Sequence, residues 1–78
     1  MLKLSHVESV ISQNKMKSST PSDYNPDPKQ MLKISAYIVA SNNALTDAES
    51  IQIANEMYLN SISDLSWAFK WQELVANI

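Results

Sequence analysis

Apolar residues along this chain recur three and four positions apart, the spacing that places side chains on one face of an α-helix. A strand would show strict alternation of apolar and polar residues, and residues 33–39 come closest to that pattern, so a strand there is the alternative. The chain contains no glycine, which disfavours the tight hairpin turns that join strands. The pattern therefore predicts an all-α fold. Its helices are expected at about 6–15, 28–41, 47–59 and from Ser61 or Ser63 to Ala76.

Residues that cap helix N-termini stand before the predicted helices. Asp27 precedes a proline at the first helical position, which is the best start signal in the chain. Ser5 and Thr46 are each followed by a glutamate three positions later, the spacing of a capping box. Between the second and third helices, Asn42 and Asn43 can adopt the left-handed turn that glycine usually supplies. The second and third helices thus have the best-defined starts.

A segment rich in lysine, serine, threonine and proline separates the first predicted helix from the others. We divide the chain into a short N-terminal helix over 1–15, a linker over 16–27 and a compact antiparallel bundle of three helices over 28–78, within a single domain. The linker is long enough for the tethered N-terminal helix to pack on its own bundle or to reach a neighbouring subunit.

The last predicted helix is apolar on two nearly opposite sides. One stripe consists of Ile62, Leu65, Phe69 and Ala76. The core of a domain this small can absorb that stripe, which leaves the opposite one to be covered. Because tryptophan commonly anchors interfaces, we predict that the opposite stripe contacts a partner, with burial in the domain's own core as the alternative. This predicted interface consists of Trp67, Trp71, Leu74, Val75 and Ile78.

Length and composition add limits to this picture. A chain of 78 residues buries only about 60% of the surface that it exposes when unfolded, so self-association is a ready source of further burial. The absence of cysteine excludes disulfides and thiolate metal sites. No apolar run reaches the length of a signal peptide or a membrane span. We therefore expect a complete small cytoplasmic protein of the kind that phages and plasmids encode, with no membrane contact.

Catalytic and ligand-binding patterns are weak in this sequence. His6 is the only histidine, and glycine-free loops seldom supply the oxyanion hole that a serine–histidine device needs. Asp23, Asn25 and Asp27 have the spacing that opens a calcium-binding loop, but Pro28 and Ile34 occupy the positions that need glycine and glutamate. We therefore predict no enzymatic activity, no cofactor and no metal.

The charge pattern bears on nucleic-acid binding. The chain has six lysines, no arginine and eight acids, for a net charge of −2, and five of those acids lie in its second half. This balance disfavours a nucleic-acid partner.

The function predicted from these patterns is protein–protein interaction, as a small adaptor, inhibitor or regulatory subunit that self-associates through apolar helix surface. One alternative is a DNA-binding regulator of the helix-turn-helix kind over residues 44–65, although Tyr58 stands where the turn usually has glycine. A second alternative is an inhibitor whose acidic face imitates nucleic acid. That face would consist of Glu49, Glu56 and Glu73.

Overall fold

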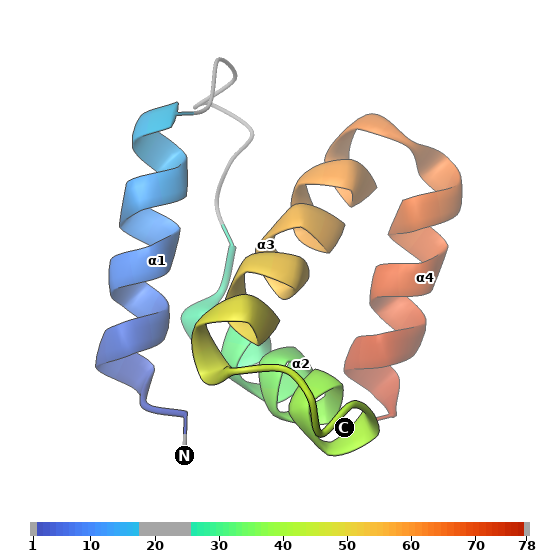
Figure 1. The fold of residues 1–78 in the computed structure, drawn as a ribbon. Coiled ribbons are helices and arrows are strands. Elements are labelled where there is room, and N and C mark those ends of the chain that lie inside the picture. Colours follow the sequence, from blue (N-terminus) through green and yellow to red (C-terminus); the bar gives the residue numbers. More distant parts are fainter. Residues whose placement is uncertain (1, 18–25, 78) are drawn as a thin grey trace.

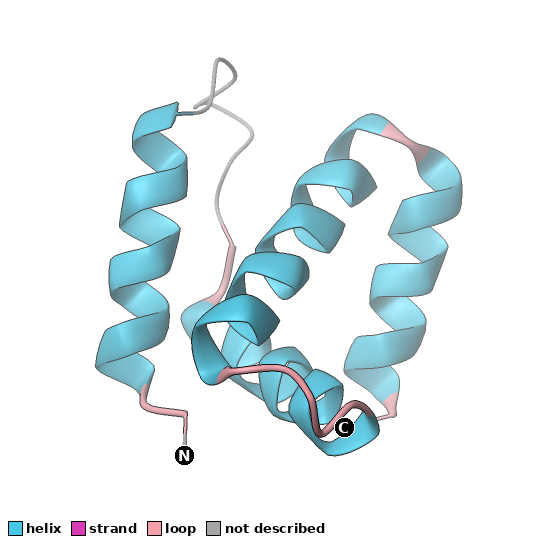
Figure 2. Ribbon diagram, in the orientation of Figure 1, coloured by secondary structure: helices cyan, strands magenta, loops and turns pink. Residues whose placement is uncertain are grey.

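The structure, a computed structural model, describes residues 2–17 and 26–77 and contains helices throughout that part of the chain (Figure 1). No strand occurs in the described residues (Figure 2), so the predicted all-α fold is confirmed and residues 33–39 are helical. The helices are α1 (Leu4–Lys17), α2 (Pro28–Ser41), α3 (Asp47–Ser63) and α4 (Leu65–Ala76).

The two middle helices organise the molecule. Both α2 and α3 contact all the other helices, whereas α1 and α4 do not contact each other. In Figure 1, α3 and α4 run side by side in opposite directions, α2 crosses beneath them, and α1 lies on the far side of α3 from α4. The bundle is therefore built on the α2–α3 pair, with α1 and α4 added on either side.

Two of the predicted N-terminal caps are confirmed. The backbone N–H of Lys29 donates to Oδ1 of Asp27 at 2.9 Å, which satisfies one of the free amides at the start of α2. At the start of α3, the backbone N–H of Glu49 donates to the Thr46 hydroxyl at 3.2 Å, and that hydroxyl donates to Oε1 of Glu49 at 3.0 Å. Side-chain oxygens thus fix where both central helices begin.

The predicted cap of α1 is wrong. This helix begins at Leu4, and the carbonyl of Lys3 accepts hydrogen bonds from the backbone N–H groups of His6 and Val7. Ser5 therefore lies inside the first turn of α1 and does not precede the helix. The helix is therefore longer at both ends than the predicted range.

The junction of α3 and α4 also differs from the prediction. The hydroxyls of Ser61 and Ser63 donate to backbone carbonyls one turn earlier, so these serines extend α3 and do not cap α4. The cap of α4 is Asp64, whose backbone is extended at φ −137° and ψ 122°. Its Oδ1 accepts from the backbone N–H of Ser66 at 2.9 Å and from the Ser66 hydroxyl at 2.7 Å. A single residue thus ends one helix and starts the next.

The turn between α2 and α3 forms without the predicted left-handed residues. No described residue has positive φ, and Asn42 is extended at φ −144° and ψ 94°. Its side-chain carbonyl accepts from the backbone N–H of Ala44 at 3.2 Å, and its backbone carbonyl accepts from that of Leu45 at 3.2 Å. These bonds reverse the chain locally, so neither Asn42 nor Asn43 needs the conformation that glycine favours.

All four helices contribute to one core. Val7 of α1 is fully buried, as are Met31 and Ile34 of α2 and Ile51 of α3. The N-terminal helix therefore packs on the bundle of its own chain. The buried apolar residues of the cluster are Val7, Val10, Ile11, Met31, Ile34, Ile51, Ala54 and Trp71.

Candidate protein interface

The structure places most of the predicted interface stripe of α4 against the core. Trp71 is only 8% exposed and belongs to the core cluster, while Leu74 and Val75 pack against that cluster. Trp67 is half-buried, and Ile78 lies outside the described residues. The side of α4 that was expected to meet a partner is therefore mostly used within the chain.

Aromatic packing explains why α4 turns this side inward. The rings of Trp71 and Tyr58 meet edge to face, with centroids 5.2 Å apart and an interplanar angle of 69°. Burying a tryptophan removes more apolar surface from water than burying any other side chain of this helix. The ammonium of Lys70 lies 5.1 Å from the centroid of the Trp67 ring, a cation–π contact that covers part of the second indole.

The opposite stripe of α4 is exposed. Leu65 keeps 73% of its surface in contact with solvent and Phe69 keeps 64%, although both were expected in the core. Ile62, in the last turn of α3, is 40% exposed. The structure thus buries Trp71 and exposes Leu65 and Phe69, because residues two positions apart on a helix, such as Phe69 and Trp71, project from nearly opposite sides.

We call Ile62, Leu65 and Phe69 the apolar corner, because these residues flank the joint where α3 meets α4. Leu65 and Phe69 are four positions apart on one helix, so they lie one above the other on the same face. Exposed Asp64 directly precedes this pair, whereas the ammonium of Lys70 lies over the Trp67 ring, on the other side of α4. Neighbouring apolar side chains with a polar rim are typical of a binding surface.

Asp64 is also distinguished electrostatically. Hydrogen bonds from the Ser66 hydroxyl, and then from the Ser66 backbone N–H, hold the pKa of this carboxyl below its ordinary value of 3.8. Both donors favour the ionised form. The corner therefore carries a carboxylate that stays charged in mildly acidic solution.

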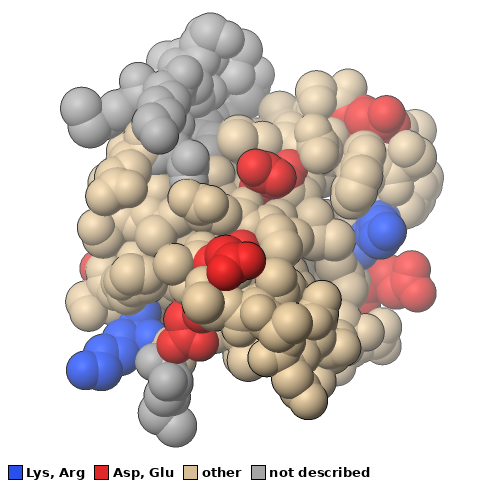
Figure 3. Space-filling model, in the orientation of Figure 1, with Lys and Arg blue, Asp and Glu red and all other residues tan. Residues whose placement is uncertain are grey.

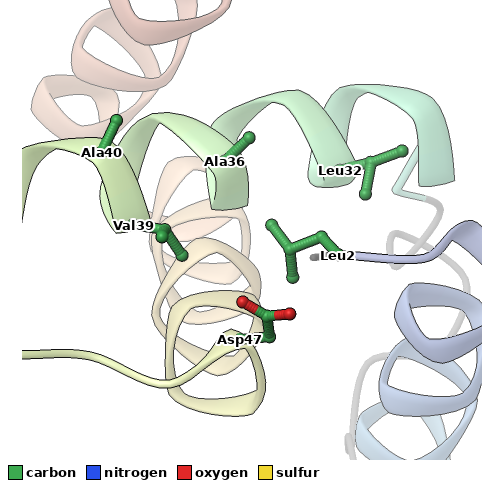
Figure 4. A pocket seen from close by; sticks show the side chains of 6 residues that line it. All are labelled: Leu2, Leu32, Ala36, Val39, Ala40 and Asp47. Atoms are coloured by element: carbon green, nitrogen blue, oxygen red, sulfur yellow. The ribbon is translucent and has the colours of Figure 1, made fainter. Parts of the chain in front are cut away.

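A second apolar feature is a hollow beside α2, shown in Figure 4. Its volume is about 450 Å³, and two alanines one helical turn apart leave room along its α2 wall. Among the described lining residues, Asp47, the first residue of α3, is the one that carries a charge, and Figure 4 shows this carboxylate beside Val39 and Leu2. We call this feature the α2 hollow. Its lining residues are Leu2, Leu32, Ala36, Val39, Ala40 and Asp47.

Sequence reasoning missed this hollow. The alanine pair at positions 36 and 40 was visible in the sequence, but a helical projection counts alanine with the apolar face of α2 and says nothing about depth. Leu2 precedes the first helix, so its approach to α2 depends on how α1 packs. Only the packed structure brings the two together.

The acidic residues singled out from the sequence are exposed but do not all share one surface. Glu49 and Glu56 are seven positions apart on α3, which contains no basic residue, whereas Glu73 lies on α4. Figure 3 shows acidic atoms spaced along the middle of the face toward the viewer, where α3 runs in Figure 1, with uncharged atoms between them. The acidic face is therefore a sparse line on α3.

The structure adds little support for the catalytic and metal-binding candidates of the sequence. His6 is exposed and lines a shallow depression with Leu2, Lys3 and Asp47. The described residues contain no group of three or more histidine, cysteine, aspartate or glutamate side chains that could hold a metal ion. Asp23 and Asn25 of the calcium-loop pattern lie outside the described residues.

Two further observations concern the helix-turn-helix alternative and the possibility of a membrane-spanning helix. Tyr58, where a helix-turn-helix motif would have its turn, lies inside α3, and this helix continues unbroken to Ser63. Among the described helices, none is both long enough and apolar enough to cross a membrane.

Comparison of the chain with protein-family models, curated proteins and solved structures gave no significant match.

Proposed function

We propose that this chain is a small non-enzymatic protein–protein interaction module that acts through apolar helix surface and self-associates. The observation that carries the proposal is the apolar corner, where Leu65 and Phe69 are 73% and 64% exposed. The surface used differs from the one predicted from the sequence, because the tryptophan stripe is largely occupied by the chain's own core.

Energetics support a binding role for the corner. Full burial of a leucine or phenylalanine side chain is worth about 1.5–3 kcal/mol, and most of that gain is still unrealised at these two positions. A bundle of this size has a net stability of only about 3–5 kcal/mol, so burying the corner against a protein would contribute on the same scale as folding itself.

The charges around the corner support a protein partner over nucleic acid. The exposed carboxylate of Asp64 directly precedes Leu65, and a basic group on a protein surface can match it. A phosphate backbone would be repelled by Asp64 and by the acidic residues of α3, a helix that offers no cation in return. Within the described helices α3 and α4, Lys70 is the only basic residue.

The test is a binding assay with a variant that removes the corner. The double substitution Leu65→Ser and Phe69→Ser is expected to abolish association of the chain with itself and with any protein that it retains in a pull-down. Because both side chains are exposed, far-UV circular dichroism of this variant should match that of the wild type.

Tyr37→Ser is the matched control, because it removes another exposed apolar side chain that lies on α2 and away from the corner. It should leave association unchanged. The proposal is wrong if the wild-type chain neither self-associates nor retains a protein, or if the corner variant binds as well as the control.

A further inference from the structure

We propose that the apolar corner binds a basic amphipathic segment of another protein, whose apolar side chains cover the corner and whose lysines or arginines meet the carboxylates beside it. This inference rests on the proposed function and deepens it by naming the chemistry of the partner. It requires that acidic groups flank the corner, that basic groups lie away from it, and that a second copy matches it less well.

Acidic side chains flank the exposed pair of α4 at both ends. Asp64 directly precedes Leu65, and Glu73 follows Phe69 by four positions, so Glu73 lies one turn further along the same side of α4. Both acids are exposed. Their positions, 64 and 73, correspond to a separation of about 14 Å along the helix axis. A partner on this side of α4 therefore meets a carboxylate, two apolar groups and a second carboxylate in that order.

The described basic groups lie away from the corner. Although Lys70 stands three positions before Glu73, its ammonium lies 5.1 Å from the centroid of the Trp67 ring. Trp67 and Phe69 are two positions apart, so they project from nearly opposite sides of α4. The exposed lysines at 29 and 33 belong to α2, which Figure 1 shows at the far end of α3 from the joint with α4. The carboxylates beside the corner are thus available to a cationic partner.

The charge of the surrounding helices has the same sign as the flanking acids. Residues 47–76 contain five acids and one lysine, which gives them a net charge of −4. The summed field of such a region attracts a cationic segment and increases its rate of association. The apolar side chains of the corner then supply the contact area, because Leu65 and Phe69 remain 73% and 64% exposed in the chain alone.

A second copy matches the corner less well than a basic segment does. If two corners met, the carboxylates of Asp64 and Glu73 from both copies would share one interface. Like charges brought together in this way weaken association. The lysines of α2 are a poor source of compensation, because exposed Asp27 lies close to Lys29 in the sequence. A basic segment should therefore bind the corner more tightly than another copy of the chain.

The test uses a synthetic peptide of about 15 residues, with leucines three and four positions apart and lysines on either side of them. Two further peptides have glutamine or glutamate in place of every lysine. Fluorescence anisotropy of a label on each peptide measures its affinity for the full chain. The lysine peptide should bind most tightly and the glutamate peptide least. In about 1 M salt the lysine peptide should lose its advantage over the glutamine peptide, because salt screens exposed charges.

A charge variant of the chain locates the binding site. Asp64→Asn with Glu73→Gln removes both flanking charges, and asparagine can still cap α4. This variant should bind the lysine peptide about 2- to 20-fold more weakly than the wild type, and the glutamine peptide equally well. The matched control is Asp27→Asn with Glu8→Gln, which also changes one capping aspartate and one exposed helical glutamate, both outside α3 and α4. It should bind all the peptides like the wild type.

The apolar part of the contact is tested separately. Leu65→Ser with Phe69→Ser should bind none of the peptides, since only the charges remain. Circular dichroism checks that each variant keeps the helical content of the wild type.

Several outcomes would overturn this proposal. They are equal affinity of the wild type for the lysine and glutamine peptides, equal losses in the charge variant and its control, and undiminished binding without the two apolar side chains. A wild type that binds none of the peptides would overturn it as well. Self-association and the pull-down described above are independent of these peptides, so the proposed function can stand when this inference fails.

Discussion

At the scale of single residues, Trp71 decides which side of α4 faces the core. Its indole packs against the edge of Tyr58 and is almost fully buried, while Phe69, two positions earlier, stays in solvent. Both stripes of α4 are apolar, and helical periodicity identifies stripes without saying which one turns inward. The sequence therefore identified both apolar stripes, but only the packed core shows that Trp71 lies inside and Phe69 outside.

Trp71→Ala should unfold the domain. Truncating a buried tryptophan costs about 3–5 kcal/mol, which equals the whole stability expected of a bundle this small. Trp67→Ala should leave the fold intact, because Trp67 is only half-buried. Urea denaturation followed by circular dichroism measures both, and equal losses from the two substitutions would contradict the burial difference.

Asp64 should make stability depend on pH in a defined direction. Its pKa is lowered in the folded state by the Ser66 hydroxyl and backbone N–H, so the ionised carboxylate stabilises the fold above the ordinary value of 3.8. That contribution is lost as the pH falls through the lowered pKa.

The measurement compares the wild type with Asp64→Asn by urea denaturation at a series of pH values. Asparagine also caps helices, so the variant keeps the joint and loses only the titrating group. The difference in stability between the two proteins should shrink as the solution becomes strongly acidic. A constant difference across the series would show that the ionisation of Asp64 does not contribute.

At the scale of helices, N-terminal caps were predictable where one residue stood out. Asp27 is followed by a proline at the first helical position and Thr46 by Glu49 three positions later, and both residues cap as expected. Near residue 64 the sequence offers three good capping side chains in a row of four positions, and local preference cannot rank them. In the structure the two serine hydroxyls donate to carbonyls within α3, and Asp64 is the residue that caps α4.

The contribution of α1 is a second prediction at this scale. Val7 is fully buried where α1 meets the bundle, so Val7→Ala should lower the free energy of unfolding by about 2 kcal/mol. The exposed neighbour Glu8 supplies the control, because Glu8→Ala removes a side chain that the core does not use. If both variants unfold at the wild-type urea concentration, α1 adds nothing to the stability of the bundle.

At the scale of the whole molecule, a small core and exposed apolar surface together make stability depend on protein concentration. Any assembly that binds the folded chain and not the unfolded one raises its apparent stability as protein concentration rises. The melting temperature of the wild type should rise by about 5 °C over a hundredfold increase in concentration.

The variant with Leu65→Ser and Phe69→Ser should melt at the same temperature throughout that range. Differential scanning fluorimetry, with the tryptophans as the intrinsic signal, measures both proteins. A wild-type melting temperature that does not change with concentration would mean that folding draws no stability from self-association.

Because Asp64 alone joins α3 to α4, a protein that binds the apolar corner would also affect the motion of α4. Because one residue joins α3 to α4, any change in the angle between these helices must occur at Asp64 or in the turns that flank it. A protein bound to Ile62, Leu65 and Phe69 would contact both helices next to the residue that joins them. Binding there would therefore reduce local unfolding of α4 along its whole length. Backbone amides as far away as that of Trp71 would then exchange their hydrogens with solvent more slowly.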